Sequence, residues 1–413
     1  MIALTENERR LKANRTLVLA ISFLSGLSFV GPIWLIYSTA HLHFSTTLAT
    51  MLFTGMWVLS AFFEIPTGAL ADRIGRRKIF ALGSLLLLLY PVAYLLALPL
   101  AIFVVALVVA SVGNAMTSGA LTPIVHRDYD HAGYSTKKYH KFLATNRASI
   151  FIARALSGVV GAILYAAQPW LPFLAWLIVS GCSVMLGLLI KEEKREAGNA
   201  MLRLHISATF RAMARSRAVV AALAAYVVIN IVTEAIWTGY QVFYQQDGLS
   251  PVVFGVLFSV IAVFSATSAY LVRKLYTRFG PIDILAFGAV LACLTSWMLF
   301  QGDVWVRILA VVPMAIASGF MAVTVSAVIQ HQVENSLQST ALSVYSVVVS
   351  VVYGMASLGV GWLLDTLQSD DVRRILLYLA IISSIVTISL ALRFTRESKF
   401  RLESPDINNE VSN

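Results

Sequence analysis

The chain has 413 residues, of which 58% are hydrophobic and only 13% are charged. A soluble globular protein carries about 25% charged residues, so this composition excludes an ordinary soluble domain and predicts an integral membrane protein. The net charge of +10 comes from bases at the ends of apolar segments rather than from one patch, which argues against a nucleic-acid-binding protein.

Twelve apolar segments lie along the chain, each near the ~20 residues that a helix needs to cross a bilayer. They cover residues 16–40, 46–71, 79–98, 101–125, 144–167, 170–190, 219–243, 252–272, 284–300, 304–329, 340–364 and 374–392. Continuous apolar segments predict membrane helices, because a barrel alternates residue by residue. We therefore expect an all-α membrane protein with twelve transmembrane helices.

The only long interval between these segments precedes residue 219. It divides the chain into an N-terminal six-helix bundle (1–190), a linker (191–218), a C-terminal six-helix bundle (219–396) and a polar tail (397–413), which we expect to be disordered. The linker repeats apolar residues at helical spacing among arginines, which predicts an amphipathic helix on the membrane surface. A solvated tether is the alternative.

The distribution of basic residues predicts the orientation. Of the 31 Lys and Arg residues, 27 fall in the segments that share one side with the N-terminus, three fall on the other side, and Arg154 lies within a span. Basic residues accumulate on the cytoplasmic side of membrane proteins. We expect a multi-pass protein of the cell membrane, the inner membrane of a bacterial cell, with both termini in the cytoplasm.

A short charged loop separates the second and third apolar segments. Residues 68–78 read Gly-Ala-Leu-Ala-Asp-Arg-Ile-Gly-Arg-Arg-Lys. This pattern resembles the signature loop between helices 2 and 3 of the major facilitator superfamily of transporters. The resemblance implies two pseudo-symmetric six-helix halves, with a substrate cavity between them that helices 1, 4, 7 and 10 line.

The resemblance also implies that this loop is a conformational gate. Asp72 would be stabilised by the positive N-terminal end of a helix that begins near Ser339 or Thr340. The candidate gate residues are Gly68, Asp72, Arg73, Gly75, Arg76 and Arg77, with Asp128 at the end of the fourth segment as the expected partner of the arginines. The two glycines allow close approach of neighbouring backbone. Alternatively, the basic residues only anchor the topology.

The two halves of the sequence repeat one another. Residues 70–83 align without a gap with residues 275–288, at an offset of 205 residues. Ile33-Trp34-x-x-Tyr37 likewise matches Ile236-Trp237-x-x-Tyr240, at an offset of 203 residues. Such a repeat is typical of transporters built from two related halves.

Three spans contain an ionisable residue away from their ends: Glu64, Arg154 and Glu234. A charge inside the membrane is costly, so each is a candidate functional group for proton coupling. Glu64 and Arg154 lie at similar depths, roughly 10 Å and 15 Å from the cytoplasmic ends of their helices, and we expect them to approach each other. Glu234 has no cation at its level and can load and release a proton. The alternative is that Glu234 simply reaches water near the outer interface.

Other polar and aromatic residues of the cavity helices are candidates for binding a substrate. They are Asn230, Trp34, Tyr37, Asn114, Trp237 and Tyr240. Aromatic rings and amides with few charges favour a small amphipathic or uncharged compound. For several of the Trp and Tyr residues, an interfacial aromatic belt is the alternative.

No nucleotide-binding loop, nucleophile elbow or zinc-ligand spacing occurs in the sequence, so we expect neither an enzyme nor a cofactor or metal. We expect a monomeric secondary transporter in the lipid bilayer, an antiporter that uses protons for efflux of a small molecule. Proton-coupled uptake of a nutrient is the first alternative, because the helix 4 arginine and helix 5 proline common in the superfamily are absent here. A sensor or assembly partner that moves no solute is the second.

Overall fold

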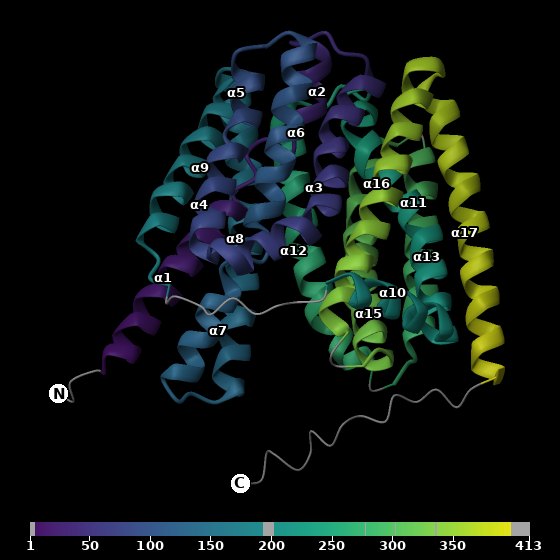
Figure 1. Cartoon of the computed structure of the whole chain (residues 1–413). Coiled ribbons are helices and arrows are strands. Elements are labelled where there is room, and N and C mark those ends of the chain that lie inside the picture. Colours follow the sequence, from purple (N-terminus) through teal and green to yellow (C-terminus); the bar gives the residue numbers. More distant parts are fainter. Residues whose placement is uncertain (1–4, 193–201, 277, 302, 335–336, 398–413) are drawn as a thin grey trace. The chain divides into compact units, whose positions relative to one another are not determined.

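The computed structural model describes residues 5–192, 202–276, 278–301, 303–334 and 337–397. These residues form helices and no strand (Figure 1), which confirms the predicted all-α fold. The helices before the linker are α1 (Glu6–Gly26), α2 (Trp34–Ala40), α3 (Thr46–Ile74), α4 (Arg76–Leu87), α5 (Leu89–Leu95), α6 (Leu100–Thr117), α7 (Thr122–His131), α8 (Thr136–Ala167) and α9 (Leu171–Leu189). Those that follow are α10 (Leu202–Arg215), α11 (Arg217–Gln246), α12 (Pro251–Leu275), α13 (Pro281–Phe300), α14 (Val304–Leu309), α15 (Val311–Gln332), α16 (Gln338–Thr366) and α17 (Ser369–Glu397).

In the described part of the chain, eleven helical segments are long and apolar enough to cross a membrane. The difference from the predicted twelve lies in the first segment, residues 16–40, which is interrupted. Helix α1 ends at Gly26 and α2 begins at Trp34. Pro32 lies in the interval, where it supplies no N–H group and its ring clashes with a continuing helix.

The interruption is held by side chains from other helices. The buried Gln241 of α11 accepts a hydrogen bond from the Leu35 N–H and donates one to the Gly31 carbonyl, both at 3.2 Å. The Ser28 N–H donates to the Ser157 hydroxyl of α8 at 2.8 Å. These bonds satisfy backbone groups that the interruption leaves without helical partners.

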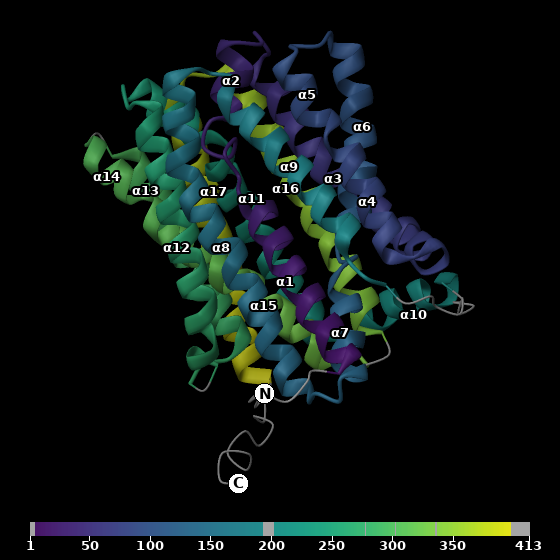
Figure 2. The same cartoon turned by 90° about the vertical axis from the view of Figure 1, so that its left-hand side faces the viewer.

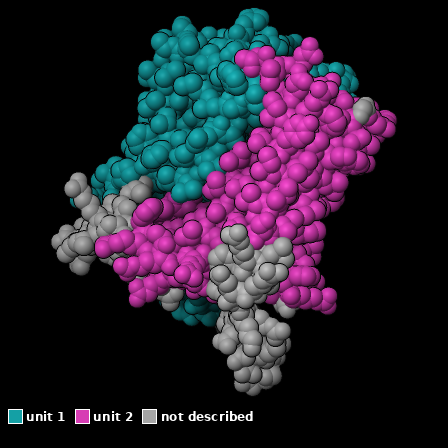
Figure 3. Space-filling view, turned by 90° about the vertical axis from the view of Figure 1, so that its right-hand side faces the viewer, with its two compact units in different colours: residues 1–203, 238–263, 346–365 teal, residues 204–237, 264–345, 366–413 magenta. Residues whose placement is uncertain are grey.

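The chain divides into two compact units (Figure 3). Unit 1 comprises residues 1–203, 238–263 and 346–365, and unit 2 comprises residues 204–237, 264–345 and 366–413. Unit 1 thus contains α1 to α9 with parts of α11, α12 and α16. Unit 2 contains most of α10, the remaining parts of α11, α12 and α16, and all of α13 to α15 and α17. The two predicted six-helix bundles, 1–190 and 219–396, stay a prediction.

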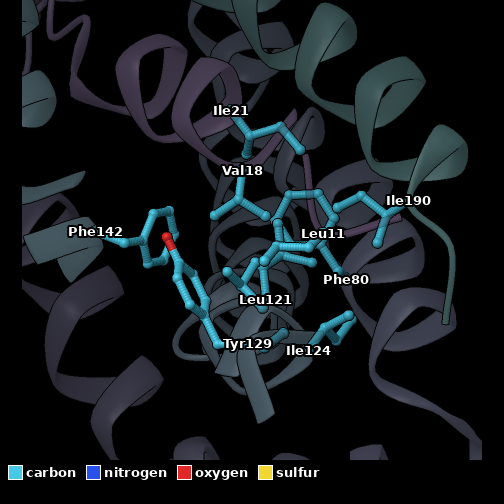
Figure 4. Packing of buried hydrophobic residues seen from close by; sticks show 11 residues of the cluster. Leu11, Val18, Ile21, Phe80, Leu121, Ile124, Tyr129, Phe142 and Ile190 are labelled. Atoms are coloured by element: carbon cyan, nitrogen blue, oxygen red, sulfur yellow. The ribbon is translucent and has the colours of Figure 1, made fainter. Parts of the chain in front are cut away.

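A core cluster of unit 1 lies where α1 meets α7, α8 and the end of α9 (Figure 4). Its buried members are Leu11, Val18, Ile21, Phe80, Ala120, Leu121, Ile124, Val125, Tyr129, Phe142 and Ile190. Helix α1 runs alongside α8 and approaches α7 with its N-terminal part (Figure 2). Burial of this apolar face orders the end of unit 1 that carries α7, opposite to the end that carries α2 (Figure 1).

A buried polar contact joins three elements beside this core. Asn14 of α1 donates to the Asp128 carboxylate of α7 at 2.7 Å and to the Lys191 carbonyl at 2.8 Å. The Lys191 N–H donates back to the Asn14 side-chain oxygen at 3.0 Å. Asn14 is fully buried, so these bonds compensate the loss of water around its amide.

The first helix begins with a reciprocal cap. The Glu8 N–H donates to the Thr5 hydroxyl at 3.3 Å, and the Thr5 N–H donates to the Glu8 carboxylate at 2.9 Å. This backbone bond from Thr5 is the main cause that holds the pKa of Glu8 below its ordinary value. The Tyr134 hydroxyl also donates to Glu8, at 3.2 Å, which raises the pKa of that phenol.

Unit 2 is organised around α13, which packs against α15 and α17. A buried cluster of Val272, Ile284 and Phe320 joins α12, α13 and α15. The Ser384 hydroxyl of α17 donates to the Ala289 carbonyl of α13 at 2.8 Å. A hydroxyl that bonds a carbonyl of the next helix is a common means of holding membrane helices together.

The linker contains the predicted helix, α10, which spans Leu202–Arg215. Within it Met213 is buried, whereas Phe210 is 62% exposed. An exposed phenylalanine is compatible with a membrane surface. Residues 193–201 and the tail beyond residue 397 lie outside the described residues.

We predict that Asn14→Ala destabilises the protein, because it removes three hydrogen bonds and takes one partner from the buried Asp128 carboxylate. The expected loss is about 2–4 kcal/mol, measured as a lower thermal unfolding midpoint of the purified protein in detergent. Thr16→Ala is the matched control, since its exposed hydroxyl bonds only its own helix at Lys12. Equal midpoints for the two variants would contradict this role of Asn14.

Candidate functional site

A cavity of about 230 Å³ lies within unit 1, beside the interruption of the first span. The residues of the interruption, Leu27–Gly31, form one wall. The other walls come from α3, α4, α6, α8 and α9. Non-helical backbone inside a membrane protein is tolerated where it lines a cavity or is covered by protein, and it is typical of binding sites in transporters.

The lining of this cavity combines polar and aromatic side chains. The α8 residue Arg154 is the one charged residue among those that line it. Asn114 and Thr117 of α6, and Ser25 and Ser28 of the first span, add amide and hydroxyl groups. Much of the remaining surface is aromatic, from Phe29, Phe53, Trp57, Phe80 and Trp176. Such a lining fits a small molecule with a large apolar part.

Of the predicted substrate residues, Asn114 lines this cavity. Trp34 is 1% exposed, and its ring stacks on Phe53 with 4.1 Å between centroids. It therefore supports a cavity wall from behind. Tyr37 lies in a buried aromatic cluster, where its ring centroid is 4.3 Å from that of Phe173 and its hydroxyl donates to the Tyr94 carbonyl.

The predicted approach of Glu64 to Arg154 is wrong for the described part of the chain. The Ser118 hydroxyl, beyond the end of α6, donates to the Glu64 carboxylate at 3.1 Å. Arg154 instead faces the cavity. Glu64 and Arg154 lie at similar depths, but their helices turn them toward different neighbours. Depth alone does not show the direction in which a side chain points.

Glu234 continues a polar row on one face of α11 in unit 2. Tyr226, Asn230 and Glu234 are four residues apart, which places them above one another on a helix. The Asn230 amide donates to the Tyr226 hydroxyl at 3.2 Å, and the Tyr226 ring meets Tyr345 of α16 edge-on at 5.7 Å. Asn230 is only 3% exposed. The row thus continues from Glu234 into the interior of unit 2.

The remaining predicted substrate residues lie on either side of a unit boundary. Trp237 is half-buried at the last position of its unit 2 segment. Tyr240 belongs to unit 1, is 1% exposed, and packs edge-on against Tyr244 with centroids 5.9 Å apart. Its neighbour Gln241, which the sequence did not single out, holds the interruption of the first span.

The charged loop is tighter than expected, because α3 ends at Ile74 and α4 begins at Arg76. Gly75 alone makes the turn, with φ +100°, a conformation that side chains disfavour. The Glu192 carboxylate accepts hydrogen bonds from the N–H groups of Arg76 and Arg77 at 3.0 and 2.8 Å. A carboxylate at this position stabilises the N-terminus of α4.

Three further gate residues, Asp72, Arg76 and Arg77, have partners within unit 1. Arg76 pairs with Asp72 at 2.9 Å, and the Arg77 guanidinium donates to the Leu188 carbonyl. Arg73 is exposed and, with the rest of the loop, lines a second cavity of about 490 Å³. Among the residues that the structure describes, none outside its own helix comes within 4 Å of a Cβ built on Gly68, so the expected close approach is absent there.

Asp128 does not join the loop arginines, contrary to the prediction. It accepts hydrogen bonds from Arg10 at 2.9 Å and from Asn14 at 2.7 Å, both on α1. The neighbouring Arg127 lies 3.5 Å from Glu192. Asp128 of α7 thus pairs with α1, and Arg127 of α7 pairs with Glu192 after α9. These partners lie far from the loop at residues 68–78 in sequence.

A carboxylate that the sequence did not single out holds α3 to α16. Asp365 accepts hydrogen bonds from the N–H groups of Thr46 and Thr47 and from the Thr47 hydroxyl, at 2.8, 2.8 and 2.6 Å. Next to it, a Cβ on Gly361 would collide with the Thr50 hydroxyl, so only glycine allows this approach. The sequence signal that could have indicated this contact is the position of Asp365, directly after the predicted span 340–364.

The sequence model of the Major Facilitator Superfamily matches residues 16–357. The chain belongs to this family. The resemblance of the loop at residues 68–78 is therefore confirmed for the chain as a whole, and the protein is a transporter of the superfamily rather than an enzyme.

Solved transporters share the fold of this superfamily member. A point mutant of the nucleoside transporter NupG superposes with a TM-score of 0.76 at 12% identity, covering 91% of this chain and 99% of NupG. A POT family transporter in complex with 5-aminolevulinic acid gives 0.74 at 14% identity, over 94% and 96%. A bacterial homologue of the human lysosomal transporter Spinster, inward-facing and occupied, gives 0.72 at 12% identity, over 96% and 98%. Among curated proteins, none matches the chain significantly.

We predict that Asp365→Ala loosens the contact between α3 and α16 in this superfamily member. With Cys182 and Cys293 replaced by serine, a cysteine at the buried position Thr50 should react several-fold faster with a maleimide in the Asp365→Ala background. The reason is that the carboxylate at the N-terminus of α3 contributes about 0.3–2 kcal/mol. Asp371→Ala, which removes only a contact with Arg374, is the control. Equal labelling rates would show that Asp365 does not hold the contact.

Proposed function

We propose that this protein is a proton-coupled secondary transporter that exports a small amphipathic compound by alternating access. The observation that supports the substrate class is the cavity beside the interrupted first span, which has aromatic walls and a single charged residue. Solved transporters of the same fold include a nucleoside transporter and a POT family transporter in complex with 5-aminolevulinic acid. Small polar and amphipathic solutes are therefore compatible with this fold. A partly apolar lining favours compounds with an apolar part.

Glu234 is the proposed proton site. It is an ionisable residue within a predicted span, and such residues are costly unless they serve a function. The Tyr226–Asn230 hydrogen bond extends its polar surroundings along α11. A carboxyl that gains and loses a proton as its access to water changes couples the proton gradient to the transport cycle.

Two carboxylates are the proposed gate. Asp365 lies near the C-terminal end of α16 and binds the N-terminus of α3. Asp72 lies near the C-terminal end of α3, where it pairs with Arg76. In the alternate state, Asp72 would leave Arg76 for the N-terminus of α16, as the signature loop implies. In the present state, Asp365 of α16 would cap the N-terminus of α3. In the alternate state, Asp72 of α3 would cap the N-terminus of α16.

The proposed setting is the cell membrane, with both termini in the cytoplasm and a monomer as the working unit. The 27-to-3 distribution of Lys and Arg supports this orientation. Uptake of a nutrient by the same mechanism is the second candidate, because the helix 4 and helix 5 patterns typical of the superfamily's proton relays and exporters are absent. A sensor or assembly partner that moves no solute is the third candidate, and the signature loop at residues 68–78 argues against it, because a protein that does not cycle has no use for a bistable contact.

We predict that the wild-type protein lowers the cellular accumulation of some members of a panel of labelled toxic compounds, whereas Glu234→Gln does not. The amide keeps the shape of the carboxyl but carries no titratable proton. Glu334→Gln, the same change at an exposed loop position, should behave as wild type.

Higher accumulation in cells with the wild-type protein would reverse the direction to uptake. Equal export by the wild type and Glu234→Gln would remove the coupling role of Glu234. No effect across a wide panel would favour the non-transporting alternative.

We predict that Asp72→Asn slows transport about tenfold or more, since a neutral amide loses the interaction with a helix N-terminus that closes the loop end. Binding of an exported compound to the purified variant should stay within about threefold of wild type, because Asp72 lies outside the substrate cavity. The measurement compares initial transport rates in proteoliposomes with equilibrium binding. Unchanged transport would contradict the gate.

A further inference from the structure

Arg154 is a charge inside a membrane-spanning helix for which the described part of the chain supplies no counter-ion. It lies near the middle of α8, within the span Thr136–Ala167. Glu64, the expected partner, is bonded by Ser118 instead. A guanidinium at such a depth is costly unless an anion or water accompanies it, and Arg keeps its charge under all ordinary conditions.

The cavity into which Arg154 faces is rich in donors and has no acid. Asn114 and Ser25 line it with Arg154, and their side chains form no hydrogen bond with any other described residue. Ser28 contributes a further hydroxyl from the interrupted segment. None of the residues that line the cavity is Asp or Glu. Its formal charge is therefore +1, which matches one negative charge on a ligand.

The remaining walls favour a ring or a short chain over a second charged group. Trp57 and Trp176 face the cavity from α3 and α9, and Phe29 and Phe53 add two more rings. The volume of about 230 Å³ is below the roughly 300–1,000 Å³ of pockets for drug-sized ligands. The ligand is therefore small, with one acidic head and one apolar body.

We propose that this cavity binds a small amphipathic monocarboxylate, with Arg154 as the residue that selects the negative charge. This inference rests on the proposed transport function and specifies its substrate class. The planar guanidinium presents two parallel N–H groups that match the two oxygens of a carboxylate. Asn114 and the serines then complete the hydrogen bonds of the head group, while the aromatic rings cover the body.

The test is calorimetric binding to the purified full-length protein in detergent, with four probes that share one ring system. The probes are 2-naphthoate, 2-naphthalenemethanol, 2-naphthylmethylamine and 2-naphthyl phosphate. We expect the carboxylate to bind at least about tenfold more tightly than the neutral alcohol, as a charge-assisted hydrogen bond implies. The amine should be the weakest ligand. This comparison needs no variant, so it does not depend on a mutant that folds.

Variants then assign the preference to one side chain. Arg154→Gln should bind the carboxylate and the alcohol within about threefold of each other, and Arg154→Lys should keep part of the preference. Arg147→Gln, an exposed position two turns earlier on the same helix, is the matched control and should bind as wild type.

The proposal is overturned if the carboxylate binds no more tightly than the alcohol, if none of the probes binds, or if the phosphate monoester binds most tightly. An unchanged preference in Arg154→Gln would overturn the role of Arg154. Transport of 2-naphthoate in proteoliposomes is measured separately. Binding of 2-naphthoate without transport would support the carboxylate site and contradict the proposed transport function. Export of other compounds without binding of 2-naphthoate would support the transport function and contradict the carboxylate site.

Discussion

The structure of unit 1 depends on how the first span is interrupted without leaving backbone groups unsatisfied. In an apolar environment each unpaired N–H or C=O costs several kcal/mol. Gln241 bonds to the Gly31 carbonyl within the interruption and to the Leu35 N–H in the first turn of α2, and Ser157 satisfies a further N–H group of the interruption. Because these partners come from α11 and α8, the interruption also ties distant parts of the chain together. The cavity beside it exists because the first helix does not continue through that volume.

The same principle separates the charges that stabilise the fold from those that point to function. Asp128, Glu192 and Asp365 each accept several hydrogen bonds and hold elements together at the ends of helices. Arg154 and Glu234 lie inside spans, where the protein provides polar neighbours but no opposite charge among the described residues. A binding or coupling role explains why such a cost persists. The proposed transport cycle assigns the solute to Arg154 and the proton to Glu234.

The helical fold was predictable because a membrane helix appears in a sequence as a long apolar segment, and the signature loop identified the family. The interruption of residues 16–40 was not, since Gly31-Pro32 is equally compatible with a kink. Pairings were the least predictable feature. Asp128 was assigned to the loop arginines and binds Arg10 and Asn14 instead, because helix rotation decides which neighbour a side chain meets. Asp365 was overlooked because a carboxylate at a span end is common and its partner lies far away in sequence.

The proposed transport cycle requires that α3 and α16 are capped alternately, by Asp365 at one end and by Asp72 at the other. The most direct measurement is electron-spin distance analysis of two labelled pairs in lipid, Ser45 with Gln368 and Ile74 with Leu337, at high and low pH and with bound substrate. Alternate capping predicts that conditions which lengthen the first distance shorten the second. Distances that stay constant, or that lengthen together, would contradict alternating closure by these two carboxylates.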